Sequence, residues 1–75
     1  MKNYANLHGN SSIQRYLIDN DYVVVEFNDF SQYKYSYVSV GIANIEEMKR
    51  LAVRGWGLNS FIRRYVKTSY ESRLN

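Results

Sequence analysis

Residues Tyr22–Phe27 read YVVVEF, and this stretch carries the strongest strand signal in the chain. β-branched and aromatic residues favour extended backbone. Side chains of a strand alternate between its two faces, so Val23, Val25 and Phe27 share one face. We expect that face to be buried in the core.

The stretches on either side of YVVVEF have strand character too. Ser12–Asp19 is rich in β-compatible residues and is joined to YVVVEF through the turn-favouring pair at residues 20 and 21. After the polar residues 28–32, the run Tyr33–Val40 again alternates. One face of that run carries Tyr33, Tyr35 and Tyr37. The order predicts a three-stranded antiparallel meander.

The period of the apolar residues then changes from two to about 3.6, which is typical of a helix. The first residues at this spacing are Ile45, Met48, Leu51 and Ala52. Asn44 is expected to cap the start of this helix, with Glu47 as its capping-box partner. Gly55 stands where a helix end favours a left-handed residue.

A second amphipathic helix of about three turns follows the pair of glycines at residues 55 and 57. Its expected inner face consists of Leu58, Phe61, Ile62, Tyr65 and Val66. Asn59 stands directly before the apolar-periodic part of this helix, and its side chain is expected to cap the helix start. The basic residues Arg63, Arg64 and Lys67 then point outward.

These patterns predict an α+β fold in which a three-stranded antiparallel β-meander is followed by two amphipathic helices packed on one face. The predicted core contains Val23, Val25, Phe27, Met48, Leu51, Phe61 and Ile62. We expect residues 1–10 to be a flexible N-terminal segment, residues 11–70 to form a single domain and residues 71–75 to be a tail.

The composition narrows the class of protein. The 75 residues suffice for one domain with one core, and the absence of cysteine rules out a disulfide framework and a thiolate metal site. Residues 1–10 are polar, so no secretory signal is expected and a cytoplasmic location follows. No stretch has the roughly 20 apolar residues of a membrane span.

The chemistry of an enzyme is poorly represented. His8 is the only histidine and lies in a polar segment. Phosphate-cradling glycine motifs are absent, and the aspartates beside the first turn have no EF-hand spacing. We therefore expect a non-enzymatic protein without a metal or another cofactor.

Charge is unevenly distributed along the chain. Residues 45–75 hold seven of the ten basic residues and only three of the seven acidic ones. Such asymmetry favours an anionic partner. The candidate binding residues are Arg50, Arg54, Trp56, Arg63, Arg64 and Lys67. The alternative is ordinary solvation of helix faces, with Arg50 paired to Glu46 one turn away.

The aromatic residues leave alternatives open as well. Tyr33 and Tyr35 are a possible stacking platform for bases, as in sheet-based RNA-binding folds, or they are core and rim residues. Trp56 lies in a two-glycine turn between basic helices. It is either an exposed anchor for a partner or a plug of the small core.

Three patterns in sequence add a family resemblance. They are Val23-x-Val25-x-Phe27, Tyr33-x-Tyr35-x-x-Val38 and Gly55-x-Gly57-Leu58-Asn59-x-Phe61-Ile62. Together they resemble the KTSC domain, a short module appended to some lysyl-tRNA synthetases and also found alone in bacterial and phage proteins. The resemblance covers residues 11–70 and implies this fold, and the synthetase context suggests RNA binding. The chain departs from the family at Phe30, where glycine is common, and at Trp56, where a polar residue is frequent.

The leading expectation is thus a small nucleic-acid-binding module, for RNA before DNA, that uses the basic helical surface. The alternative is a small regulator or inhibitor of the kind that phages and mobile elements encode, which binds a host protein. Self-association through an uncovered sheet face is a third reading, so the chain is expected to be a monomer or a weak homo-oligomer.

Overall fold

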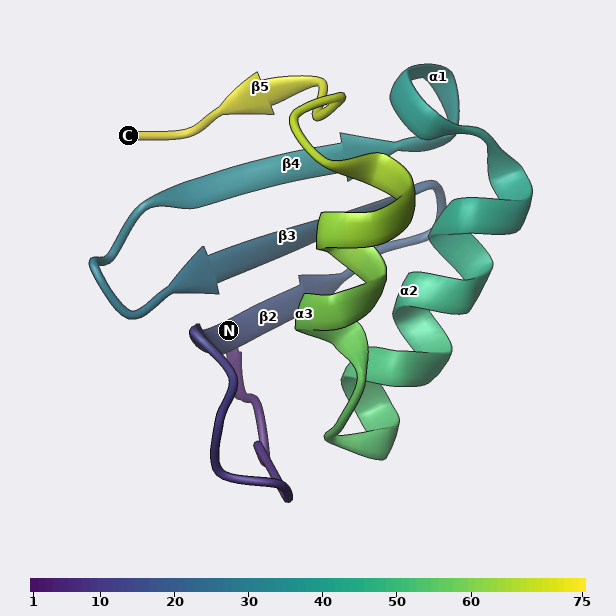
Figure 1. The fold of residues 1–75 in the computed structure, drawn as a ribbon. Coiled ribbons are helices and arrows are strands. Elements are labelled where there is room, and N and C mark those ends of the chain that lie inside the picture. Colours follow the sequence, from purple (N-terminus) through teal and green to yellow (C-terminus); the bar gives the residue numbers. More distant parts are fainter.

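The computed structural model describes all 75 residues and has a five-stranded antiparallel sheet with the helices on one side (Figure 1). The strands follow in chain order: β1 (Lys2–Asn3), β2 (Ile13–Ile18), β3 (Tyr22–Phe27), β4 (Gln32–Ser36) and β5 (Ser72–Arg73). The helical elements are α1 (Tyr37–Val40), α2 (Ile42–Arg54), α3 (Leu58–Phe61) and the π-helix η1 (Ile62–Val66). None of them has the length and apolar character that a membrane-spanning helix needs.

The centre of the fold confirms the α+β class. β3 pairs with β2 on one side and with β4 on the other, in the register Val23 to Tyr35 and Val25 to Tyr33. Both valines are completely buried beneath the helices. Five of the seven predicted core residues are buried: Val23, Val25, Met48, Leu51 and Ile62. Phe27 and Phe61 only pack against the edge of the core, so their predicted full burial is wrong.

Both ends of the chain belong to the sheet, which corrects the expected three strands. Lys2–Asn3 pairs with β2, and Ser72–Arg73 pairs with β4. Tyr4 is buried in the core, so the ordered fold extends beyond the predicted domain limits of 11 and 70. Strands of two residues are too short to show an alternating pattern, so periodicity could not reveal them.

The predicted third strand is too long. It ends at Ser36, and Tyr37–Val40 forms the short helix α1 instead. The cause is a capping box, in which the Ser36 hydroxyl accepts from the backbone N–H of Ser39 and the Ser39 hydroxyl accepts from that of Ser36. This reciprocal pair stabilises a helix start.

The start of α2 also differs from the prediction. Gly41 is the N-cap and Asn44 lies inside the first turn, where its side-chain amide donates to the carbonyl of Val40 at 2.8 Å. At the other end, Gly55 adopts the predicted left-handed conformation, with φ 89° and ψ 11°. The backbone after α2 therefore turns sharply toward the second helical segment.

The second helical segment winds partly as a π-helix, and this changes which side chains it buries. Leu58, Ile62 and Val66 face the core at intervals of four residues. A π-helix bonds residue i to i+5 and holds more residues per turn than an α-helix. Tyr65, expected inside from the α-helical period, is consequently 61% exposed.

Candidate nucleic-acid interface

The four glutamates of the chain neutralise four of its ten basic residues. The ion pairs are Arg15–Glu26, Lys34–Glu71, Lys49–Glu46 and Arg50–Glu47. Each has a nitrogen–oxygen distance of at most 3.2 Å. The cations outside these pairs decide where an anionic partner could bind.

On α2 the candidate Arg50 is already engaged. Its guanidinium donates to both carboxylate oxygens of Glu47, at 2.8 and 2.6 Å, and lowers the pKa of that carboxyl. The predicted partner, Glu46, instead binds Lys49 and accepts from the hydroxyl of Tyr37 at 2.6 Å. Arg50 lies near Arg64 in the shallow groove between α2 and α3, but its charge is compensated.

Arg54, at the end of α2, is engaged in a different way. Its guanidinium carbon lies 3.3 Å from the centroid of the Trp56 ring, and two of its nitrogens donate to the Trp56 carbonyl. Such a cation–π contact uses one face of the indole. Gly57 leaves room for it, because a Cβ there would lie 2.7 Å from the Arg54 guanidinium.

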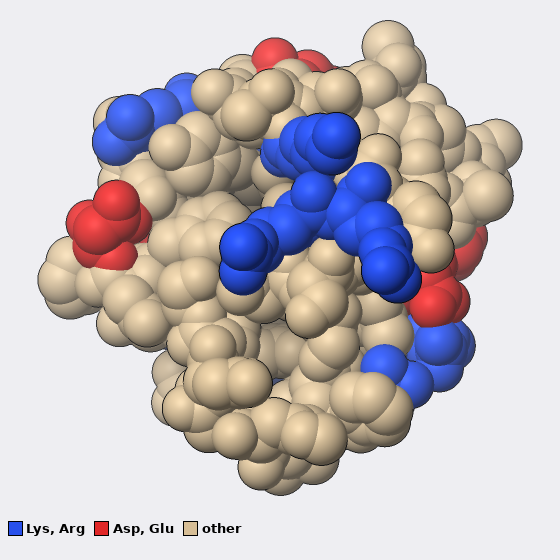
Figure 2. Space-filling view, viewed as in Figure 1, with Lys and Arg blue, Asp and Glu red and all other residues tan.

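Arg63, Arg64 and Lys67, here called the basic triad, are all exposed and form no ion pair. Together with Ser60 they line one shallow depression of the surface. Figure 2 shows these basic side chains in the middle of the face over α3 and η1, with acidic side chains only at the rim. No acidic residue occurs between Glu47 and Glu71, and Glu71, four residues after Lys67, is paired with Lys34 instead.

Lys67 has an unusual backbone conformation at the end of η1, with φ 47° and ψ −118°. Two hydrogen bonds hold it there: its N–H donates to the carbonyl of Ile62 at 2.6 Å, and its own carbonyl accepts from the hydroxyl of Tyr35 at 2.8 Å. A strained residue persists only where its surroundings fix it. The core thus fixes the position of this member of the basic triad.

Neither tyrosine proposed as a stacking platform is open to a base. Tyr35 is 2% exposed, and burial raises the pKa of its hydroxyl to about 12. Tyr33 is half-buried, and its ring centroid lies 4.6 Å from that of Tyr70 and 5.8 Å from that of Phe27. Both rings belong to the helix-covered side of the sheet.

Tyr65 is an exposed aromatic residue, although the α-helical period predicts it on the inner face of the second helix. Its ring packs on Phe61 with centroids 4.9 Å apart, and it lines the groove between α2 and α3 together with Arg64. An exposed ring beside a cation is suited to stacking on a base. Because the α-helical period turned Tyr65 inward, only the π-helical winding reveals it.

Trp56 is 40% exposed and lies outside the core cluster, so it does not plug the core. The centroid of the His8 ring is 5.1 Å from that of the indole, with the two planes tilted by 45°. His8 comes from the N-terminal segment, which the backbone hydrogen bond from Leu7 to Gly55 holds against the turn after α2. Close packing of Ala5 on Gly55 supports this contact.

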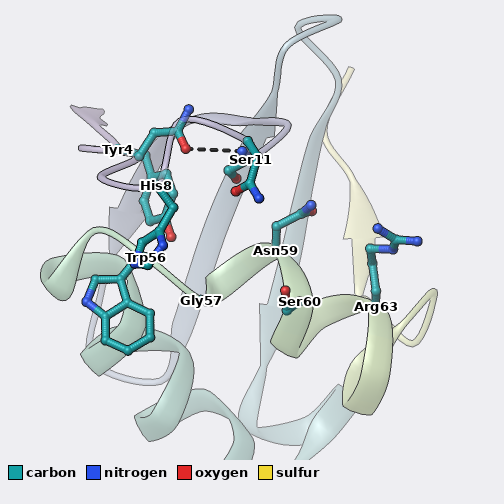
Figure 3. Close-up of a pocket in the computed structure, with 10 residues that line it drawn as sticks. Tyr4, His8, Ser11, Trp56, Gly57, Asn59, Ser60 and Arg63 are labelled. Atoms are coloured by element: carbon teal, nitrogen blue, oxygen red, sulfur yellow. Dashed lines mark hydrogen bonds between the residues drawn. The ribbon is translucent and has the colours of Figure 1, made fainter.

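A polar groove of about 370 Å³ lies between this N-terminal segment and α3. Trp56 and His8 flank one end, Asn59 and Ser60 lie along the middle, and Arg63 stands at the other end (Figure 3). The prediction that Asn59 caps this helix is wrong, because Gly57 is the N-cap of α3 and no side chain caps it. The side-chain oxygen of Asn59 accepts from the hydroxyl of Ser12 at 3.4 Å instead.

Comparison with known proteins gives no match: no family model, no curated protein and no solved structure is detectably similar to this chain. The resemblance to the KTSC domain stays a prediction. Phe30, one of its two departures, has a positive φ of 68° and is exposed. No group of three or more histidine, aspartate or glutamate side chains is placed to hold a metal ion.

Proposed function

We propose that this protein is a non-enzymatic module that binds single-stranded RNA through the phosphate backbone. The observation that carries the proposal is the basic triad, three exposed cations on one helical face without a carboxylate partner. Phosphate contacts from arginine and lysine supply most of the affinity of sequence-independent binding. The polyanion takes the place of the missing carboxylates.

The treatment of the other cations supports a binding role over ordinary solvation. Lys49 and Arg50 are paired within their own helix, although Arg50 is well exposed. A chain that pairs its exposed arginine on α2 could have paired Arg63 or Arg64 with one acidic residue a turn away. That segment contains none.

Two exposed aromatic residues favour a single strand as the ligand. Tyr65 lies beside the basic triad on one side, and Trp56 lies across the polar groove on the other. Unpaired bases stack on such rings, whereas the bases of a duplex are already stacked on one another. Cations flanked by aromatic rings match the alternating phosphates and bases of a strand.

The test is a titration of fluorescently labelled, mixed-sequence RNA of ten nucleotides, followed by anisotropy at several salt concentrations. Three phosphate contacts to a single strand predict a slope of about −2 for the logarithm of the association constant against that of the salt concentration. Affinity that is absent, or that does not depend on salt, contradicts the proposal. Salt-resistant capture of a host protein that Trp56→Ala abolishes would instead support the protein-binding alternative.

A further inference from the structure

The polar groove has three chemically different parts in a fixed order. At one end lie the rings of Trp56 and His8, in the middle the amide and hydroxyl side chains of Asn59 and Ser60, and at the far end the guanidinium of Arg63 (Figure 3). A nucleotide also has three parts in order, which are an aromatic base, a hydroxylated sugar and an anionic phosphate. The volume of the groove, about 370 Å³, lies within the range of small-molecule sites.

The middle of the groove has hydrogen-bonding capacity left over. The Asn59 oxygen is used by Ser12, but the side-chain nitrogen of Asn59 donates to no protein group. The hydroxyl of Ser60 is exposed and makes no hydrogen bond to another protein group. In contrast, the neighbouring hydroxyl of Ser11 already accepts from the N–H of Ile13 at 3.0 Å. The unused amide and hydroxyl lie between the aromatic and cationic ends.

We infer that this groove holds one ribonucleotide, with the base at Trp56 and His8, the ribose at Asn59 and Ser60, and the phosphate at Arg63. Asn59 and Ser60 contact the 2′-hydroxyl, the group by which a protein distinguishes RNA from DNA. Arg54 covers one face of the indole, so the base packs against the side of Trp56 that faces the groove. The inference rests on the proposed function and adds to it the origin of a preference for RNA.

The same ligand chemistry is available from a free nucleotide and from one residue of a strand. The surface around the groove favours the strand, because Ser60 and Arg63 belong both to the groove and to the depression of the basic triad. A strand that enters the groove with one nucleotide continues over Arg64 and Lys67 with its next phosphates. A free nucleotide reaches only Arg63.

The test uses the fluorescence of Trp56, the only tryptophan of the chain, which reports on the groove itself. The intact protein is titrated with an adenosine tetranucleotide of RNA, with its deoxy counterpart and with adenosine 5′-monophosphate. We expect the RNA to change the fluorescence and to bind about three- to tenfold more tightly than the DNA, the worth of one hydrogen bond to the 2′-hydroxyl. The monophosphate should bind at least about tenfold more weakly than the tetranucleotide, because it lacks two phosphate contacts.

Variants separate the parts of the groove. Asn59→Ala combined with Ser60→Ala should remove the difference between RNA and DNA, whereas Arg63→Gln should weaken both to the same extent. Asn20→Ala, in the exposed turn between β2 and β3, is the matched control and should leave both affinities unchanged. Circular dichroism confirms that each variant remains folded.

The outcomes distinguish this inference from the proposed function. Equal affinity of the wild type for RNA and DNA, or binding seen by anisotropy without any change at Trp56, overturns the groove and leaves the basic triad standing. A monophosphate that binds as tightly as the tetranucleotide overturns the assignment to a strand. Absence of any binding to either oligonucleotide overturns both proposals.

Discussion

The two helical segments that cover the sheet carry three basic residues each, but they use them differently. On α2, Lys49 and Arg50 are paired with glutamates and Arg54 stacks on Trp56. On the segment from α3 to the residue after η1, none of the three members of the basic triad has a carboxylate partner. Equal basic charge in the sequence therefore corresponds to a structural role in one helix and to an available surface in the other.

The difference teaches that acidic neighbours, rather than the number of arginines, identify the surface available to an anion. Exposed ion pairs contribute little to stability, at most about 1 kcal/mol each. Their main consequence on α2 is to compensate charge. If pairing decides which cations bind an anion, substitutions on the two helices should differ in their effect on binding.

The largest effect on stability is expected at Gly55, the joint between the two helices. A Cβ at this position would lie 2.7 Å from the Cβ of Ala5, and φ is 89°. Strain and overlap together predict that Gly55→Ala lowers the free energy of unfolding by about 2–4 kcal/mol. Gly9→Ala is the control, because φ there is 75° but nothing lies within 4 Å. Urea denaturation measures both, and equal losses would contradict the packing of the N-terminal segment on the joint.

The next expected effect is on RNA affinity, and it differs between the two helical segments. Arg63→Gln with Arg64→Gln removes two phosphate contacts and should weaken binding of single-stranded RNA roughly 25-fold at 0.1 M salt. Lys49→Gln with Arg50→Gln removes the same charge from α2 and should change affinity by less than about threefold, since those cations are paired and the remaining field is screened. Anisotropy titrations give both values. Similar losses from the two pairs would mean that net charge alone determines binding.

A smaller effect on binding is expected at Tyr65. Because this ring is exposed, Tyr65→Ala should leave the melting temperature nearly unchanged. Loss of one stacked base should weaken RNA binding by about 1 kcal/mol, which is about fivefold. Val53→Ala, at a similarly exposed apolar position on α2, provides the control. A substantial fall in melting temperature for Tyr65→Ala would show that the tyrosine ring is packed in the fold and is not an exposed stacking surface.

A separate effect, on the pH dependence of stability, concerns the paired charge on the open face of the sheet. Hydrogen bonds from Arg15, then Gln32 and Gln14, lower the pKa of Glu26 from 4.5 to about 2. A carboxyl with a depressed pKa stabilises the fold above its ordinary pKa, and this contribution is lost as the pH falls through the folded value. Thermal melts should therefore show stability decreasing from about pH 4.5 to about pH 2.

The control for this pH dependence is a pair of variants. Glu26→Gln should flatten the decrease in that window, whereas Asp21→Asn, in the exposed turn between β2 and β3, should retain it. An unchanged profile for Glu26→Gln would show that Glu26 is not the group whose protonation matters.

Local rules in the sequence predict much of the fold. YVVVEF places Val23 and Val25 in the core, and the left-handed glycine at residue 55 ends the first long helix. The capping of α1 escaped prediction, because Tyr33–Val40 alternates like a strand and the competing serine pair at its centre decides the outcome. The terminal strands escaped because pairing with an existing edge needs no pattern of its own.

The candidate site is less predictable than the fold. The sequence singles out the basic triad and Trp56, but it does not reveal that Arg50 chooses Glu47, or that Arg54 lies on the indole. Tyr65 depends on the winding of η1, which the apolar spacing cannot distinguish from an α-helix. The groove is built from residues some fifty positions apart, as the 3.3 Å contact of the Leu58 N–H with the Tyr4 hydroxyl illustrates.

The central claim, that the second helical segment and not α2 contacts RNA, is tested most directly by nuclear magnetic resonance. Uniformly ¹⁵N-labelled protein is titrated with a short single-stranded RNA, and the shift of each backbone amide is followed. We predict the largest shifts at residues 56–67, with the amides of α2 nearly unmoved between residues 43 and 52. Shifts centred on α2 or on the open face of the sheet, with residues 56–67 unmoved, would contradict the claim.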